Sequence, residues 1–179
     1  TGAFNVSQLI DDVGELCKTN SITYLLAVGI DDMKHINLKN GREYGNNLLR
    51  KMVKVFEQVV KPYDNRIYRI NGDCFAVMLN CIDKQCVEKV YYQICDKFKG
   101  ICSLSAGAVK YDKNITKDGS TLYQCVEIAL DEAKKQGKSH LRFFREKDYE
   151  NKISIVRLKD NLKKLDKIIE NANNSNIHL

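Results

Sequence analysis

Residues 69–79 read RINGDCFAVML, and this segment decides how the chain folds. Asn71-Gly72 is the strongest short signal for a two-residue β-hairpin turn, because both positions tolerate a positive φ angle. Apolar residues stand at 67, 68 and 70, and a continuous apolar run covers 74–79. The pattern predicts antiparallel strands at 66–70 and 74–79. Asp73 lies just past the turn, where a carboxylate either satisfies turn backbone groups or binds a ligand.

Around the hairpin, hydrophobic periodicity predicts the remaining elements. The continuous apolar run at 21–30 is typical of a central strand buried on both faces. Helices are expected at 7–19, with Ser7 as N-cap, and at 43–60, 83–98 and 121–136, with a short helical turn from Asp31 to about residue 38. Strands are expected at 101–110 and, at a sheet edge, at 140–144. Strand, helix, hairpin, helix, strand is the ferredoxin-like βαββαβ order. The predicted fold class is therefore α+β, an α/β sandwich with an added helix and edge strand.

Length and composition favour one compact domain, residues 1–146, with an appendage. The chain has 179 residues, of which 44% are apolar, and a net charge of +6 that suits a phosphate-bearing ligand. No apolar run approaches the ~20 residues that cross a bilayer, and nothing resembles a signal peptide. Seven cysteines include no C-x-x-C pair and stand mostly in apolar runs. These features predict a cytoplasmic protein with reduced, buried thiols rather than disulfides or a zinc site.

Residues 147–179 differ in character from the rest. A narrow apolar stripe at 155, 158, 162, 165 and 169 runs through a strongly charged segment with an asparagine-rich end. This pattern predicts a long, thinly amphipathic helix that must bury its stripe. The helix either folds back on its own domain or leads into a second domain.

Several segments together resemble the GGDEF family, the diguanylate cyclases. Residues 71–75, NGDCF, resemble the Gly-Gly-Asp-Glu-Phe signature, and residues 25–49 resemble the family's first strand and following helix. The opening Thr1-Gly2 with Asn5 and the segment AKKQGKSH at 133–140 also match, in the family's order. The resemblance implies the fold of nucleotide cyclases and polymerase palms. It also implies an activity: two GTP molecules, held by two facing domains, are joined into cyclic di-GMP.

The same resemblance places the family's catalytic metal ligands at positions 29, 73 and 74, which here hold Gly29, Asp73 and Cys74. Magnesium prefers hard oxygen ligands, so a glycine and a neutral thiol leave Asp73 as the remnant ligand. Magnesium is then expected only together with a bound nucleotide. Asp31, two residues along, is expected to cap the next helical turn rather than substitute. Cyclase activity is predicted to be lost; the alternative is an active cyclase with an altered metal site.

Nucleotide binding is expected to survive better than catalysis. Asn37 matches the family position that hydrogen-bonds the guanine edge, and Asn46 replaces the companion acid with an amide, which cannot pair with two guanine donors. The resemblance also gives three phosphate-contacting positions, filled by Lys34, Lys134 and Lys138. Lysine stands for arginine at 138, so a bidentate grip is lost. The family's product-inhibition motif is absent, because its two positions hold proline and asparagine.

The resulting hypothesis is a catalytically silent GGDEF domain that regulates an attached EAL phosphodiesterase, either by binding GTP or a related nucleotide or by forming a homodimer. Residues 147–179 resemble the helix that joins such domains. An RNA-binding domain of the same strand order is disfavoured, because only Phe75 offers a stacking surface on the 74–79 strand. No DNA or RNA partner and no membrane contact are expected for this segment of chain.

Overall fold

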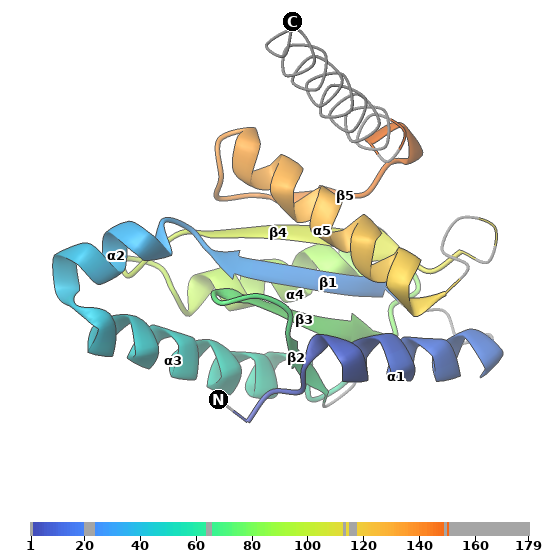
Figure 1. Ribbon diagram of the computed structural model, residues 1–179, viewed down its shortest axis with the longest axis horizontal. Helices are drawn as coiled ribbons and strands as arrows, with labels where there is room; N and C mark the ends of the chain where they lie inside the picture. Colours follow the sequence, from blue (N-terminus) through green and yellow to red (C-terminus); the bar gives the residue numbers. More distant parts are fainter. Residues whose placement is uncertain are drawn as a thin grey trace, which may run out of the picture. The chain divides into compact units, whose positions relative to one another are not determined.

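A five-stranded sheet in the order β2-β3-β1-β4-β5 forms the centre of the computed structural model (Figure 1). Its strands are β1 (Tyr24–Ile30), β2 (Ile67–Arg69), β3 (Cys74–Leu79), β4 (Leu104–Lys110) and β5 (Leu141–Phe143). All neighbours pair antiparallel except β4 and β5, which are parallel. Every residue of β1 is buried, as a central strand covered on both faces requires. The predicted α+β fold and the edge position of β5 are confirmed.

In the described part of residues 1–144, five helices accompany the sheet: α1 (Val6–Thr19), α2 (Met33–Asn40), α3 (Arg42–Val60), α4 (Lys84–Asp96) and α5 (Gly119–Lys135). Helices α3 and α4 pack together against one face, in a core that includes Val28, Phe75 and Phe56. Helices α1 and α5 pack on the other face. Because side chains alternate along a strand, Gly29 and Cys74 belong to the face that α5 covers.

Helix α5 approaches β4 unusually closely at Gly107. A Cβ atom at that position would lie 2.7 Å from the carbonyl oxygen of Val126 and 2.9 Å from the carbonyl carbon of Ala129, and it would also meet the amide of Leu130. Real Cβ atoms do not come this near to backbone. Glycine is therefore required at 107 for the observed packing of helix on sheet.

The hairpin differs from the predicted two-residue turn. Strand β2 pairs Arg69 with Phe75, and the amides of Ile70 and Asn71 donate to the carbonyl oxygen of Cys74 at 3.0 and 3.3 Å. The loop therefore contains three residues, 71–73. Neither Asn71 nor Gly72 has a positive φ angle. Asp73, the third residue of the loop, is hydrogen-bonded to the neighbouring strand, because its carbonyl accepts a 3.2 Å hydrogen bond from the amide of Ile30 in β1.

The N-caps explain where the helices begin. The side chain of Asn5, rather than the predicted Ser7, caps α1 by accepting the Gln8 amide at 2.9 Å, so the helix starts one residue earlier. Asp83 and Asp118 accept amides in the first turns of α4 and α5, at 2.9 and 2.7 Å. These caps fix the first residues of α4 and α5, which the sequence pattern predicted to within two residues.

A disulfide joins Cys81 and Cys86, which contradicts the predicted reduced thiols for this pair. The chain turns between β3 and α4 and brings the two Cα atoms to 5.8 Å, within the range that a disulfide spans. Apolar surroundings predict burial, but they do not report the distance between two side chains. Among the described residues, Cys74, Cys95, Cys102 and Cys125 are free thiols, as predicted.

The structure describes residues 2–19, 24–63, 66–112, 114, 118–148 and 150. The chain divides into two units, Thr1–Phe144 and Arg145–Leu179, and all the elements above belong to the first. The predicted stripe at 155–169 lies outside the described residues. Across those ranges, every helix is too short or too polar to cross a bilayer.

Candidate functional site

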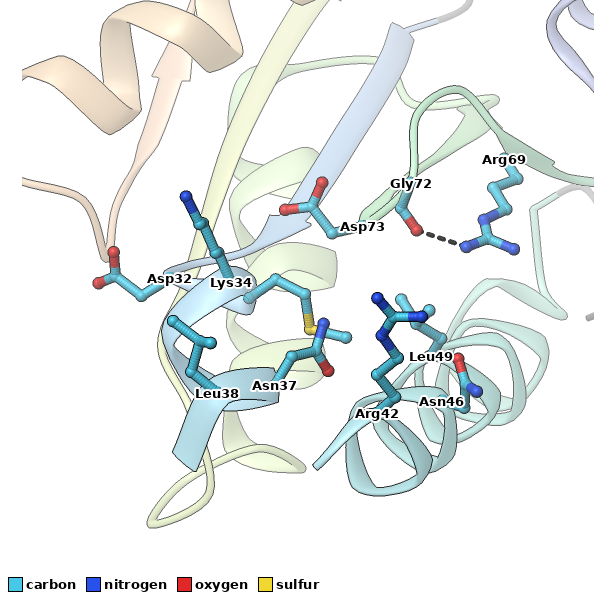
Figure 2. Close-up of a pocket in the computed structure, with 11 residues that line it drawn as sticks. Asp32, Lys34, Asn37, Leu38, Arg42, Asn46, Leu49, Arg69, Gly72 and Asp73 are labelled. Atoms are coloured by element: carbon cyan, nitrogen blue, oxygen red, sulfur yellow. Dashed lines mark hydrogen bonds between the residues drawn. The ribbon is translucent and has the colours of Figure 1, made fainter. Parts of the chain in front are cut away.

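The hairpin tip faces α2 and α3 across an open pocket of about 770 Å³ (Figure 2). Helix α2 starts directly beyond the end of β1, so the first strand and the hairpin converge on the same end of the sheet (Figure 1). Side chains from all three elements line the pocket: Asp32, Met33, Lys34, Asn37, Leu38, Arg42, Asn46, Leu49, Arg69, Gly72 and Asp73. Four of the predicted site residues, Lys34, Asn37, Asn46 and Asp73, are thus brought together.

The other metal-ligand positions lie behind the hairpin tip. Gly29 and Cys74 are paired across β1 and β3, as the resemblance to the family implied. Lys134 reaches this place from α5. Its Nζ lies 3.6 Å from Oδ2 of Asp73 and 3.6 Å from Sγ of Cys74. One carboxylate, one thiol and one ammonium therefore stand where the family resemblance predicts carboxylates.

Protonation decides the charge of this group. Burial and the neighbouring Asp73 carboxylate raise the pKa of the Cys74 thiol to about 12, so the sulfur is neutral at pH 7. Burial by itself lowers the pKa of Lys134, but Cys74 and Asp73 outweigh burial and the net pKa is raised. Because the thiol is neutral at pH 7, Asp73 is the negatively charged group that raises the pKa of Lys134 at this pH. Lys134 is an ammonium ion, paired with that carboxylate.

Asp31 plays a structural part and does not cap α2 as predicted. The side chain is 3% exposed. Its Oδ1 accepts the Ser105 hydroxyl at 2.7 Å, and its Oδ2 accepts the Ser139 amide at 3.2 Å. Asp31 therefore ties the end of β1 to β4 and to the loop after α5.

That loop presents Lys138 at the rim of the site. Its Nζ donates to Oδ1 of Asp32 at 2.6 Å, and this hydrogen bond holds the pKa of the exposed Asp32 carboxyl below its ordinary value. Lys138 and Ser139 both adopt positive φ angles, 63° and 58°, in the turn that carries them back to the sheet. Lys138, predicted as a phosphate contact, is thus paired with a carboxylate beside the pocket.

Asn37 and Asn46 face the pocket from α2 and α3 (Figure 2). The Oδ1 atom of Asn37 is buried and, within the described part of the chain, has no hydrogen-bond partner. It lies against Gly45, where any Cβ atom would overlap it. Glycine at 45 therefore leaves room for the Asn37 amide oxygen between α2 and α3.

Two further cations, Arg42 and Arg69, complete the pocket. Arg69 donates from Nη2 to the Gly72 carbonyl at 2.5 Å (Figure 2), and its guanidinium lies 5.8 Å from the centre of the Phe75 ring. Neither arginine is among the site residues predicted from the sequence. A cation two residues before the hairpin loop is the signal that could have identified Arg69.

The charge of the pocket is positive. Its lining holds three cations, Lys34, Arg42 and Arg69, against two carboxylates, Asp32 and Asp73. Both carboxylates are themselves paired with lysines from outside the lining, at 2.6 and 3.6 Å. The residues that surround the open space therefore favour an anionic ligand.

Magnesium, which the family resemblance implies, does not fit these residues. Within the described ranges, no group of three or more histidine, cysteine, aspartate or glutamate side chains is arranged to hold a metal ion. Asp73 is the one carboxylate among the three expected positions, and an ammonium ion is already 3.6 Å from it. The donor set is one hard oxygen group beside a neutral thiol, which magnesium binds poorly.

A palm-like sheet with a polar hairpin tip opposite two helices defines a domain of the nucleotide cyclase class. Residues 5–140 match the family model described as diguanylate cyclase, GGDEF domain. The chain therefore belongs to the GGDEF family, as its sequence motifs predicted. No curated protein shows significant similarity to it.

Solved structures share this fold at low sequence identity. The GGDEF domain of DgcB from Caulobacter crescentus, solved in complex with c-di-GMP, is 18% identical, with a TM-score of 0.72 over 80% of this chain and 92% of that one. The active GGEEF domain of a diguanylate cyclase from Vibrio cholerae is 21% identical, with a TM-score of 0.67 over 79% and 97%. Diguanylate cyclase SiaD from Pseudomonas aeruginosa, in complex with its activator SiaC, is 20% identical, with a TM-score of 0.71 over 80% and 59%.

Proposed function

We propose that this GGDEF domain binds GTP or a related nucleotide as a regulatory module and does not synthesise cyclic di-GMP. The observation that carries the proposal is the group formed by Gly29, Asp73, Cys74 and Lys134. Two of the three expected metal-ligand positions lack a carboxylate, and the third carboxylate is paired with an ammonium ion 3.6 Å away.

The loss is large enough to abolish practical turnover. Phosphoryl transfer relies on metal ions that neutralise the leaving phosphates and activate the attacking hydroxyl. Each carboxylate near a metal contributes on the order of 4 kcal/mol in a partly screened site, before dehydration. Because ~1.4 kcal/mol corresponds to a factor of ten in rate, removing two carboxylates costs several powers of ten.

The pocket nevertheless keeps the chemistry that binds a nucleotide. Lys34, Arg42 and Arg69 offer positive charge to phosphates from three sides of the space (Figure 2). Asn37 and Asn46 line the same space, and their amide groups can hydrogen-bond the polar edge of a base. These observations support nucleotide binding; we expect magnesium only on the phosphates of the bound nucleotide.

The regulatory role follows the family context. We propose that the domain is cytoplasmic, that it precedes an EAL phosphodiesterase domain, and that nucleotide occupancy or homodimer formation changes the activity of that partner domain. Among its structural neighbours, one was solved with c-di-GMP and another with an activator protein. A nucleotide and a protein partner are accordingly the two kinds of ligand that we expect here.

Two measurements test the proposal. Incubation with GTP and either magnesium or manganese, followed by chromatography for cyclic di-GMP, is expected to give no product; product at a rate comparable with active diguanylate cyclases would refute the loss of catalysis. Calorimetry with GTP is expected to show micromolar binding. Lys34→Gln should weaken it about tenfold, because a charge-assisted hydrogen bond is worth ~1.5–3 kcal/mol.

The control is Lys39→Gln, a lysine of the same helix that does not line the pocket. Equal losses for Lys34→Gln and Lys39→Gln would indicate non-specific electrostatics rather than a site. No detectable heat with GTP would refute nucleotide sensing and leave a dimerising scaffold.

A further inference from the structure

The ammonium group of Lys134 occupies the space in which a side chain at position 29 would begin. A Cβ atom built on Gly29 would lie 3.0 Å from Nζ of Lys134, 3.2 Å from its Cε and 2.7 Å from Sγ of Cys74. These distances are tighter than ordinary Cβ contacts. The place that the family gives to a metal-binding carboxylate is thus filled by the end of a lysine.

The surroundings hold the ammonium there as a charged group. Asp73 lies 3.6 Å from Nζ, and both side chains of this ion pair are 30% exposed. The ammonium faces Asp73 at the hairpin tip and the sulfur of Cys74, while Cε of Lys134 lies beside Gly29. Lys134 comes from α5, whose approach to the sheet is fixed by the backbone contact at Gly107.

We propose that Lys134, which lies behind the hairpin tip and pairs with the pocket residue Asp73, takes the charge-neutralising place of a divalent ion, so that a nucleoside polyphosphate binds without magnesium. The inference rests on the proposed nucleotide-binding function and says how that function is achieved. The local charge explains why: Asp73 and Lys134 sum to zero, so a divalent ion gains no net attraction from the protein at this point.

An ammonium ion can do part of the work of magnesium, but not all of it. Its three N–H donors can neutralise and hydrogen-bond phosphate oxygens, and it is attached to the chain, so it does not dissociate. It cannot lower the pKa of a ribose hydroxyl as a coordinated metal does. A site built this way would bind the substrate of a cyclase and fail to turn it over.

Calorimetry of GTP binding to the whole chain, with excess EDTA and then with excess magnesium, tests the inference. The native protein is expected to bind GTP with dissociation constants that agree within about threefold in the two conditions, which is less than 1 kcal/mol. Lys134→Gln removes the charge and keeps the length. In EDTA it should weaken binding by about 10- to 100-fold, the value of a charge-assisted hydrogen bond.

Two companion variants separate charge from fold. Lys134→Arg keeps the charge and should retain most of the affinity. Lys135→Gln changes the next residue, a lysine that is 69% exposed and pairs with Glu132 at 3.0 Å rather than with Asp73, and should bind as the native protein does. Unchanged thermal unfolding of Lys134→Gln shows that the comparison concerns the site.

The outcomes distinguish this inference from the function on which it rests. Binding that requires magnesium would overturn the inference and leave the nucleotide-binding function intact. Lys134→Gln binding as tightly as the native protein in EDTA would also overturn it. No binding in either condition would refute the nucleotide-binding function, and the inference with it.

Discussion

Restoring the two missing carboxylates tests the electrostatic account of this site most directly. In the native chain, Asp73 contributes −1 and Lys134 contributes +1, which sum to zero. Gly29→Asp brings the local charge to −1, and Gly29→Asp combined with Cys74→Glu brings it to −2. The two positions face each other across β1 and β3, so both new carboxylates would lie beside Asp73.

The expected gain in metal affinity follows from these charges. A carboxylate about 4 Å from a cation contributes ~4 kcal/mol per unit charge at an effective dielectric constant near 20. Dehydration of the new carboxylates and repulsion by Lys134 offset much of this, so we assign about 2 kcal/mol to each, or about 30-fold. The double variant should bind Mn²⁺ about a thousandfold more tightly than the native chain. The single variant Gly29→Asp should gain less than 30-fold in Mn²⁺ affinity, because the new carboxylate would pair with Lys134.

Electron paramagnetic resonance provides the assay, because the sharp signal of free Mn²⁺ broadens on binding. The matched control is Gly29→Asn with Cys74→Gln, which adds side chains of nearly the same size without charge. Both double variants must first show cooperative thermal unfolding, since position 74 is 3% exposed and tolerates polar groups poorly. If the folded, charged variant binds Mn²⁺ no better than the neutral one, the electrostatic reasoning is wrong.

Three further predictions concern the scaffold around the site. Tyr68→Phe should cost ~1.5–3 kcal/mol at pH 7, because it removes the 2.6 Å hydrogen bond from the phenol to the Asp12 carboxylate, and chemical denaturation measures the loss. Reducing the 81–86 disulfide should lower the free energy of unfolding by about 2 kcal/mol, which is the loop-closure contribution of so short a loop. The loss should appear as a lower melting temperature in the presence of reductant. Asp31→Asn should cost ~1–3 kcal/mol, because an amide cannot accept both of the buried hydrogen bonds, and should loosen the Lys138 turn, seen as faster amide exchange.

Asp12 also gives the first of these predictions a pH dependence. Burial raises the pKa of this carboxyl, but hydrogen bonds from Tyr68, Gln8 and Arg66 outweigh burial and lower it below its ordinary 3.8. The folded state therefore holds its proton less tightly than the unfolded chain. The resulting stability is present above the ordinary pKa of 3.8 and is lost as the pH falls through the lowered folded-state pKa. The difference between native and Tyr68→Phe should shrink over that range; a constant difference would show that Asp12 is not the partner that matters.

The predictions for the 81–86 disulfide and for Asp31→Asn have their own controls. Cys95→Ser removes a free thiol and should leave the response to reductant unchanged, whereas Cys81→Ser should abolish it. Ser105→Ala removes a donor to Asp31 and also the hydroxyl that accepts the Ser139 amide at 3.1 Å, so it should loosen the same turn. Equal protection of the Lys138 turn in native and Asp31→Asn proteins would contradict the role given to that carboxylate.

The fold was largely predictable because its signals are local. The buried run that ends at Ile30 and the 74–79 strand have continuous apolar patterns, and the helix at 42–60 has a clear apolar stripe. The prediction of a two-residue turn was wrong, because it rested on the local preference of Asn-Gly alone. The sheet instead recruits the carbonyl of Asp73 to pair with β1, and this contact spans 43 residues of chain.

The sequence motifs predicted four of the residues that line the pocket, but not the electrostatics of the site. Family motifs located Asp73, Asn37 and Lys134, yet no pattern in the sequence shows that Lys134 lies against Asp73 and Gly29. That arrangement depends on how α5 packs on the sheet. Arg69 and the disulfide were missed for the same reason, since both depend on distances between segments rather than on residue type.

The close packing of α5 on β4 makes the position of Lys134 depend on Gly107. Lys134 stands one helical turn beyond Leu130, whose amide meets Gly107. A methyl group at position 107 would push α5 away from β4 and move the Lys134 ammonium away from the hairpin tip, although position 107 does not line the pocket. Divergence in this domain can thus retune the ion preference of the cavity through a residue that no inspection of the cavity walls would single out.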